Sequence, residues 1–499
     1  MKRNTWRKHH KWLGILFCLF MLMFCLSGII LNHRQAVSHI NVERGWLPER
    51  YHYKAWNSGL MRGTTKYTGK DSVSCILVYG TGGIWKTDKK ATSFSDFNKG
   101  LPDGADYRQI KSIVQTSDKD LYAVSIFGLY RYDGKECVWQ SVNLPKGDEE
   151  LLTDAICSND TLVVLGRSYL YVSVTPYTSF RKIQLKEPTD YKKEVTLFRT
   201  VWTFHSGELF GMTGRIVVDM IAVILILLCV TGLMLWLLPK YVKEMRKRGG
   251  KADKALWLTR ISLLWHDKLG RTTIVFTLFI AITGWCLRPP VMLPLVLNKV
   301  PAVLGTVLDS DNPWNDKLRM IRYDKDCGDW LISTSEGFYS LNNLEGIPAR
   351  IGSAPPVSVM GINVFQKDKS GKWLCGSFSG LYVWNRQQHT VKDYFTHETV
   401  ENVSGPPFGK RAISGYSSDF NGHAIAVEYY KGTDAIVQPE KMEYLPMSLW
   451  NFALEVHSGR IYMGNIATYI FVFFAGIVAV WCLWSGWKIR KQGKRQRSQ

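Results

Sequence analysis

Four histidines occupy duplicated positions beside strongly apolar stretches of the sequence. His10 opens "HKWLG" and His266 opens "HDKLG" 256 residues later, while His205 and His457, 252 residues apart, each open an "HSG" triplet. Neutral imidazoles on facing helices are axial ligands that hold a b-type haem iron inside a helix bundle. A lone histidine near a helix end is usually an ordinary interfacial side chain. Four at repeated positions favour two haem sites, with His10 facing His266 and His205 facing His457.

Other residues fit the same chemistry. Gly14 and Gly270 follow the first two histidines at a spacing of four, on the same helical face, so a flat macrocycle or a neighbouring helix can come close. His33 lies 23 residues after His10 and is a candidate to replace or supplement an outer ligand. The arginines that are candidates to meet a haem propionate are Arg34, Arg215 and Arg460. A plain ion pair between Arg215 and Asp219 is the equally weighted alternative for that residue.

Four apolar runs suit membrane spans, which need about 20 residues each. They are Trp12–Leu31, Ile216–Leu238, Thr272–Leu287 and Ile466–Trp487, the third of them short. The chain has a net charge of +21, and three segments (the N-terminus, residues 240–271 and the tail from Lys488) hold 21 Lys/Arg against three acids. Because cytoplasmic segments are enriched in Lys and Arg, we expect both termini and residues 240–271 to be cytoplasmic. The charge therefore reflects topology and does not indicate nucleic-acid binding.

The spacing of these motifs indicates that the sequence is one unit that occurs twice. Each span ends in a Ser/Thr-Gly step, at Ser27-Gly28, Thr231-Gly232, Thr283-Gly284 and Ser485-Gly486. The predicted boundaries are 1–33 for the N-terminus and first helix, 34–204 for a β domain, 205–239 for the second helix, 240–271 for a basic loop, 272–297 for the third helix, 298–456 for a second β domain, 457–487 for the fourth helix and 488–499 for a basic tail.

The two long outer loops carry a repeat of their own. Segments such as "ILVYGTGGIWKT", "LYAVSIFGLYRY" and "WLCGSFSGLYVW" each join an apolar strand, a small turn and a Gly-apolar-aromatic strand. Gly83 and Gly128 are 45 residues apart, and Gly337 and Gly380 are 43 apart. Such a period is typical of propeller blades, and one propeller shared between the loops competes with two separate β domains. The predicted fold class is an α+β membrane protein: four transmembrane helices in two duplicated pairs, plus all-β, propeller-like repeats outside.

The four span segments resemble the PepSY-associated transmembrane family, also called iron-regulated membrane proteins. The matching pieces are "HKWLGILFCLFMLMFCLSGIILNHR", "HSGELFGMTGRIVVDMIAVILILLCVTGLMLWL", "WHDKLGRTTIVFTLFIAITG" and "EVHSGRIYMGNIATYIFVFFAGIVAVWCLWSGW". The resemblance implies a multi-pass protein of a bacterial inner membrane with periplasmic outer loops. Some relatives are haem-bearing reductases that release iron from ferric siderophores. His10, His205, His266 and His457 match the family's helix-start histidines, and His33 matches a histidine sometimes found there. Blade-like repeats replace the PepSY-type domains usual in the outer loops.

The expected function is transmembrane electron transfer through two haem b groups to a periplasmic acceptor, ferric iron in a chelate such as a siderophore. Electrons would come from a membrane quinol or a cytoplasmic donor, since the sequence holds no nucleotide-phosphate loop and no flavin pattern. The absence of any CxxC motif gives no support to a zinc site. The alternative is a non-enzymatic, membrane-anchored periplasmic binding protein without haem, whose histidines only pack the bundle.

Overall fold

The computed structural model describes residues 3–69, 74–356, 358, 360–400, 409, 411–420 and 423–495. The chain divides into two compact units. The helical unit comprises Met1–Val37, Lys192–Ser310 and Leu449–Gln499, and the β unit comprises Ser38–Tyr191 and Asp311–Ser448. Each unit is therefore assembled from both halves of the duplicated sequence.

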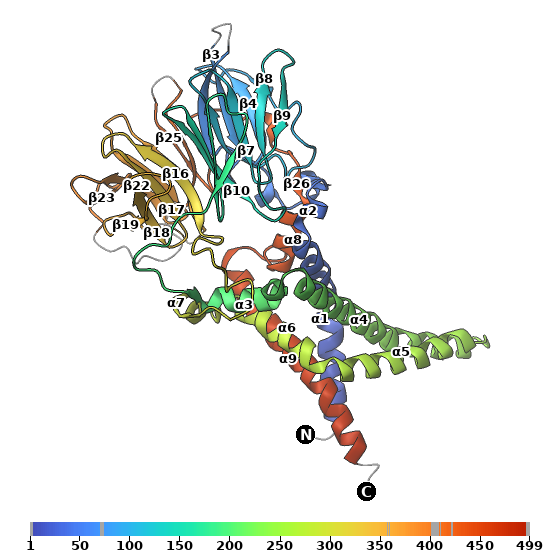
Figure 1. The fold of residues 1–499 in the computed structure, drawn as a ribbon. Helices are drawn as coiled ribbons and strands as arrows, with labels where there is room; N and C mark the ends of the chain where they lie inside the picture. The colour runs from blue at the N-terminus through green and yellow to red at the C-terminus, as the bar shows by residue number, and fades with distance from the viewer. Residues whose placement is uncertain are drawn as a thin grey trace. The chain divides into compact units, whose positions relative to one another are not determined.

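Three long apolar helices form the framework of the helical unit (Figure 1). They are α1 (Arg3–Asn32), α4 (Gly211–Lys247) and α9 (Asn465–Arg495). The spans that are long and apolar enough to cross a membrane are Arg3–Asn32, Glu208–Lys247 and Ala467–Ile489. Helix α1 packs against both α9 and α4, so residues from the two ends of the chain lie side by side. At 1.5 Å per residue, each of these helices exceeds the roughly 30 Å hydrocarbon layer.

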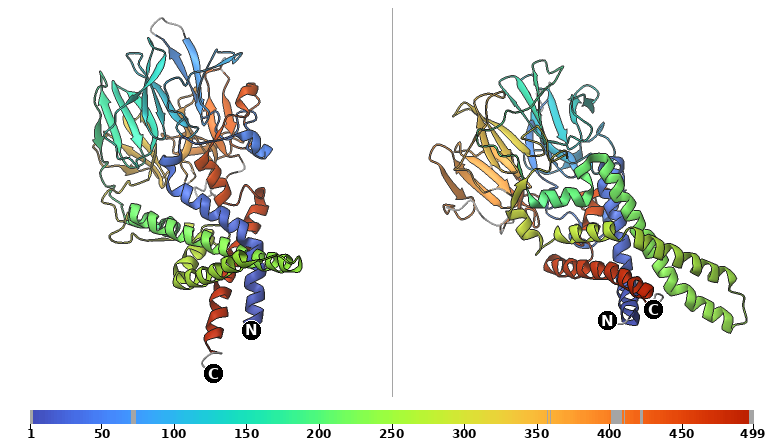
Figure 2. Two further views of the ribbon diagram at one scale, coloured as in Figure 1. Left: turned by 90° about the vertical axis from the view of Figure 1, so that its right-hand side faces the viewer. Right: turned by 60° about the horizontal axis from the view of Figure 1, so that its bottom comes forward.

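The segment expected to hold a loop and a third span is instead two helices, α5 (Asp253–Thr272) and α6 (Ile274–Cys286). Helix α5 occupies most of the predicted basic loop at 240–271 and runs back along α4, as Figure 2 shows. The two helices meet at a bend of 70° and count as a fourth span only if they are taken together. With 13 residues, α6 alone is shorter than a span, because it ends where Arg288 and a double proline follow.

Two short helices precede α4 and α9, and the same sequence ends both. Helix α3 (Leu197–Ser206) and helix α8 (Leu449–His457) each finish within the HSG triplet. Gly207 and Gly459 take positive φ values of 77° and 79°, the left-handed conformation of a helix C-cap. At Gly207 a side chain would also meet the Gly214 carbonyl oxygen at 2.2 Å. The triplet therefore places a histidine in the last turn of a helix that must then turn sharply.

Smaller elements complete the helical unit. Strand β14 (Glu194–Thr196) pairs antiparallel with β15 (Lys299–Pro301), which brings the segments before α3 and after α7 (Met292–Leu297) together. The Thr196 hydroxyl caps α3 by accepting a hydrogen bond from the Arg199 backbone N–H, 3.1 Å away. Helix α2 (Arg34–Val37) and the 3₁₀ turn η3 (Glu208–Phe210) lie at chain reversals.

The β unit consists of sheets whose strands pair antiparallel, except for one parallel pairing of β2 with β24 that joins strands from the two segments of this unit into one six-stranded sheet (Figure 1). Three come from its first segment: β2–β5 (Gly63–Thr68, Ser74–Gly80, Gly83–Thr87, Phe94–Asp96), β6–β9 (Ile110–Gln115, Leu121–Ser125, Leu129–Asp133, Val138–Val142) and β10–β13 (Leu152–Ser158, Thr161–Gly166, Leu170–Val174, Arg181–Ile183). The second segment contributes β16–β19 (Leu318–Asp324, Asp329–Thr334, Gly337–Leu341, Ala349–Arg350), β20–β23 (Ile362–Lys367, Trp373–Ser377, Gly380–Asn385, Thr390–Asp393) and the pair β24–β25 (Ile413–Ser417, Ile425–Glu428). Strands β1 (Asn41–Val42) and β26 (Met447–Ser448) pair separately, and the 3₁₀ turns are η1 (Arg44–Trp46), η2 (Glu49–Tyr51) and η4 (Glu440–Met442).

The core of the β unit lies between successive sheets. The first strands contact each other in the order β2, β6, β10, β16, β20, β24, and β24 pairs with β2 through Gly63 and Tyr416. Six apolar clusters each draw on two neighbouring sheets, and one of them joins β2–β5 to β24–β25. Because each sheet is buried on both faces by its neighbours, its strands have short apolar sequences such as Leu121–Ser125, in which every residue is buried.

Candidate functional site

The four repeat-related histidines form two pairs in the helical unit. The imidazole centroids of His10, on α1, and His266, on α5, lie 5.9 Å apart. Those of His205, at the end of α3, and His457, at the end of α8, lie 6.0 Å apart. We call these the inner pair and the outer pair, after the membrane sides expected from the charge distribution. Each pair joins one histidine from each half of the duplicated chain.

Each histidine packs against the Ser/Thr-Gly step of another helix. A methyl group added at Gly284 would lie 2.7 Å from Cε1 of His205. The corresponding distances are 3.0 Å for Gly486 and His10, 3.2 Å for Gly28 and His457, and 3.4 Å for Gly232 and His266. These contacts are close to or below the van der Waals limit, so the steps carry glycine because the ring occupies the space of a side chain.

The hydroxyl before each glycine contacts Nδ1 of the same histidine. The four distances are 3.4 Å for Ser485 and His10, 2.9 Å for Thr231 and His266, 3.2 Å for Thr283 and His205, and 3.1 Å for Ser27 and His457. Every one of these hydroxyls donates its proton to a backbone carbonyl of its own helix, at 2.6–2.8 Å. A hydroxyl has one proton, so it must accept from the histidine, and Nδ1 must carry the hydrogen.

A backbone carbonyl reinforces this assignment at one histidine of each pair. The Nδ1–H group of His10 lies 2.9 Å from the Cys482 oxygen, and that of His457 lies 2.9 Å from the Phe24 oxygen. Both carbonyls stand four residues before the contacting glycine. Carbonyls only accept, so these two imidazoles are held as the Nδ1–H tautomer, and the Thr231 and Thr283 hydroxyls favour the same tautomer at His266 and His205. This tautomer keeps a lone pair at Nε2, the form that binds a metal through Nε2.

The glycines on the histidines' own helices have the second of the two roles expected for them, the close approach of a neighbouring helix. A side chain at Gly14 would meet Cys482 Sγ at 3.5 Å, and one at Gly270 would meet Leu228 at 3.7 Å. Both glycines therefore allow close approach of a neighbouring helix, α9 or α4, and none of their near contacts is a histidine ring. The glycines that border the imidazoles are those of the Ser/Thr-Gly steps, which the sequence marked only as the ends of spans.

His33 has a partner of its own. Its Nε2 lies 2.7 Å from the Asp219 carboxylate on α4, which also accepts a hydrogen bond of 2.9 Å from the Asn32 side chain. The nitrogen that would bind a metal is thus already engaged. Asp219 therefore pairs with His33. From the sequence, a plain ion pair between Asp219 and Arg215 is one of the two alternatives.

Two of the arginines proposed for a propionate are committed elsewhere. Arg460 makes a two-pronged ion pair with Glu455, at 2.9 Å and 2.5 Å. The Arg34 guanidinium stacks on the Trp450 ring, 3.9 Å from its centroid. Both interactions are of kinds that satisfy guanidinium groups at protein surfaces.

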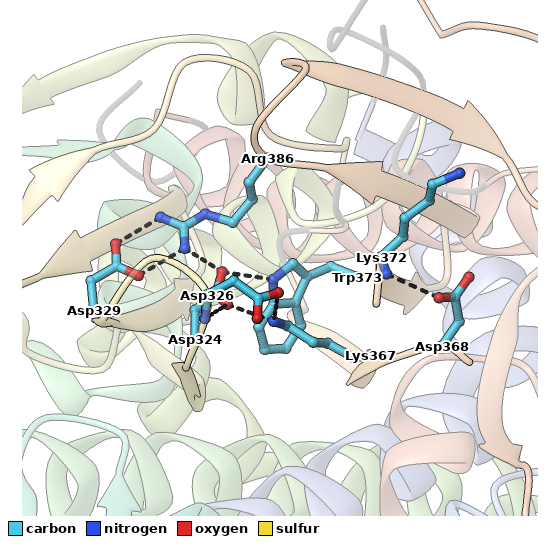
Figure 3. Close-up of polar contacts among 8 residues, drawn as sticks. All are labelled: Asp324, Asp326, Asp329, Lys367, Asp368, Lys372, Trp373 and Arg386. Carbon is cyan, nitrogen blue, oxygen red and sulfur yellow. Dashed lines mark hydrogen bonds and ion pairs between the residues drawn. The ribbon is translucent and has the colours of Figure 1, made fainter. Parts of the chain in front are cut away.

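A second cluster of ligand-type side chains lies in the β unit, at the turn between β16 and β17 (Figure 3). Among the described residues, Asp324, Cys327 and Asp329 are the one group of three such side chains close enough to share a metal. Arg386 bonds both carboxylates at 2.6–2.8 Å, and Lys367 bonds Asp324 at 2.6 Å. Desolvation raises the pKa of Asp324, but its bonds to Lys367, Arg386 and Trp373 outweigh this and lower the pKa to about 2. Because protein cations already neutralise these acids, the cluster is an ion-pair network.

Comparison with known proteins places the chain in a family. A model described as the PepSY-associated TM region matches residues 1–238 and, a second time, residues 140–489. The chain belongs to the PepSY-associated TM family. Its family and its apolar helices make it a membrane protein. The resemblance found in the four span segments is thereby confirmed at the level of the family.

Other comparisons are less informative. No curated protein sequence matches the chain. The solved structures that resemble it include the extracellular domain of BT4673 from B. thetaiotaomicron, with 10% identity, a TM-score of 0.34 and coverage of 76% of this chain and 38% of that one. The extracellular domain of BT3049 from the same organism has 10% identity, a TM-score of 0.34 and coverage of 75% and 39%. The chain spans under two fifths of the length of these structures.

Proposed function

We propose that this PepSY-associated TM protein holds two b-type haems, one between His10 and His266 and one between His205 and His457, and moves electrons across the membrane. The observation that carries the proposal is the tautomer common to all four histidines. Each ring is anchored through Nδ1–H to another helix and keeps the Nε2 lone pair for a metal. Structural histidines that only pack a bundle have no need of one tautomer at four places.

The donor set fits haem better than a bare metal ion. Among the described residues, neither histidine pair belongs to a group of three ligand-type side chains. A structural zinc site takes four protein ligands and a catalytic one takes three, whereas haem supplies its own in-plane nitrogens and needs only axial ligands. His10 with His266 and His205 with His457 would hold the two groups, and the centroid separations of 5.9 Å and 6.0 Å would let one metal bind an imidazole from each side chain of a pair at about 2 Å.

The chain's own residues set the spacing of the two sites. His10 lies on α1, and the same helix supplies Phe24 and Gly28 to His457. These positions are 14 and 18 residues from His10, or roughly 20–27 Å along a helix. The two sites therefore stand near opposite ends of one span. Haem, when bound, supplies one-electron redox chemistry, and the protein supplies ligation, separation and exclusion of water.

The proposal extends to topology and partners. The basic segments support a bacterial inner-membrane protein with four spans, both termini cytoplasmic and the β unit periplasmic. The cyclic order of strand contacts and of apolar clusters supports a single six-bladed propeller shared by the two loops. We infer that the β unit receives a ferric chelate of the siderophore kind, and that a quinol or a cytoplasmic protein delivers the electrons.

Proteoliposomes test this function. Vesicles that contain haem-loaded protein enclose a membrane-impermeant reductant, and ferric citrate with ferrozine is supplied outside. We expect ferrous iron to form outside, and we expect His266→Ala and His457→Ala each to stop it, because either change breaks the path. His389→Ala is the matched control, since His389 lies in the β unit and contacts Ser353. Equal rates with and without protein would contradict electron transfer and favour a haem-free anchor for a binding module.

A further inference from the structure

Arg288 stands beside the outer histidine pair. It follows α6, whose Thr283-Gly284 step packs on His205, and its charge lies within electrostatic reach of both His205 and His457. The other charged or ionisable groups that face it are Arg460, Glu455 and Tyr469. The charge of Arg288 therefore acts on both histidines of the outer pair.

The charges around Arg288 do not balance. Glu455 is the one carboxylate that acts on it, and that carboxylate is bonded through both oxygens to Arg460. No described residue makes a hydrogen bond or ion pair with the Arg288 side chain. A guanidinium removed from water without a carboxylate is costly, so an arginine left in this state signals an anion that completes the site.

The duplication makes this position informative. Arg288 comes 22 residues after His266, and Asn32 comes 22 residues after His10, so the two occupy the same place in the repeat. In the first half Asn32 at this place donates a hydrogen bond of 2.9 Å to the Asp219 carboxylate, so the protein supplies its own acid there. In the second half the cation is present and no carboxylate of its own pairs with it. Arg288 therefore lacks the carboxylate partner that the equivalent position has in the first half of the chain.

We propose that Arg288 binds a carboxylate of the group held between His205 and His457, namely a propionate of the outer haem. The inference rests on the proposed function, because it requires haem at the outer pair. A planar guanidinium matches a carboxylate with two parallel N–H···O bonds, and such pairing fixes orientation as well as adding affinity. Arg288 would thus set how the macrocycle is turned about the axis that joins the two imidazoles.

Porphyrin esters provide the test. In the full-length protein carrying His10→Ala, so that only the outer pair binds haem, iron(III) protoporphyrin IX and its dimethyl ester are titrated and followed by absorption. We expect the free acid to bind about tenfold more tightly than the ester. Arg288→Gln should remove most of that preference by weakening the acid alone, and Arg288→Lys should restore part of it. Arg34→Gln is the matched control, since Arg34 stacks on Trp450 and should leave the preference intact.

The outcomes separate the two proposals. Binding of both porphyrins with the same preference in Arg288→Gln would overturn the role of Arg288 while leaving the outer haem in place. Failure of the His10→Ala protein to bind either porphyrin would remove the outer haem, and the role of Arg288 with it. Circular dichroism and size-exclusion elution of each variant identify loss of fold. The midpoint potential of the outer haem gives a second measure, which should fall when the cation is removed.

Discussion

The histidine pairs of the helical unit and the acid cluster of the β unit both gather groups that bind metals, yet they differ in what the protein leaves open. At Asp324 and Asp329, Arg386 and Lys367 take up the carboxylate oxygens at 2.6–2.8 Å. At the histidines, the protein satisfies Nδ1 at every ring, and the structure gives none of their Nε2 atoms a hydrogen-bond partner among the described residues.

This difference separates a structural cluster from a candidate ligand site. In an ion-pair network the charged side chains neutralise each other, and the network contributes to the folded structure. A ring held by one nitrogen with the second left open has an oriented donor and a fixed tautomer, which is what metal ligation requires. The distinction depends on the hydrogen-bond inventory of each group and not on the residue types, which are equally suited to metals in both places.

The largest expected effect is the loss of one haem. His457→Ala should halve the haem bound per chain, because the outer pair then has one ligand, while the inner pair is unchanged. Asp329→Asn, in the acid cluster, should leave the haem content at the wild-type value. The pyridine haemochrome assay on purified protein measures both. An undiminished haem content in His457→Ala would show that His457 is not a ligand.

The next largest effect is a loss of haem affinity that depends on how closely each glycine contacts a histidine ring. Gly284→Ala places a methyl group 2.7 Å from the His205 ring, whereas Gly232→Ala places one 3.4 Å from the His266 ring. The first ring is also held by its hydrogen bond to Thr283, so it must tilt to make room for the methyl group. We expect Gly284→Ala to weaken haem binding at the outer pair tenfold or more and Gly232→Ala to change the inner pair little. Haem titrations on proteins that retain one pair give both numbers, and equal losses would argue against the ring contacts.

The acid cluster should lose its contribution to stability at low pH. The folded-state pKa of Asp324 is about 2, below its ordinary value of 3.8. A depressed carboxyl pKa stabilises the fold fully above pH 4 and ceases to do so as the pH falls toward 2. Urea unfolding of the β unit, followed by tryptophan fluorescence, should show this loss, and Arg386→Gln should cost roughly 3 kcal/mol at neutral pH. An unchanged midpoint in Arg386→Gln would show that the network carries little stability.

The smallest effect concerns the hydroxyls. Thr231→Val removes the acceptor that lies 2.9 Å from His266 Nδ1 but keeps the shape of the side chain. Haem should stay bound, and the potential of the inner haem should rise slightly, because an imidazole with a weaker Nδ1 hydrogen bond is a poorer donor. Thr231→Ser should keep the wild-type potential. A redox titration in which all three proteins agree would mean that the hydroxyl does not act on the ring.

Much of this arrangement could be predicted from the sequence, and the reasons are local. The repeated histidines, the HSG triplets and the strand pattern of the outer loops are properties of short segments, and the family assignment follows from the four spans. The facing of His10 with His266 and of His205 with His457 follows from the duplication, because equivalent positions in two repeats meet at a pseudo-twofold axis.

The rest depends on contacts between distant segments. The bend between α5 and α6 arises where Thr272 and Thr273 join two helices; no proline marks it, and Gly270 in the last turn of α5 does not by itself predict a break. The partnership of Ser27 with His457 joins residues 430 apart, and a Ser/Thr-Gly step alone is indistinguishable from an ordinary helix contact. The isolation of Arg288 could not be foreseen either, since it depends on Glu455 being taken by Arg460.

An absorption spectrum of the detergent-purified protein, before and after dithionite, tests the central claim most directly. The account predicts a Soret band and, on reduction, the sharp α band of low-spin haem with two histidine ligands, at two haems per chain. A colourless protein from haem-replete cells that also fails to take up added haem would contradict it.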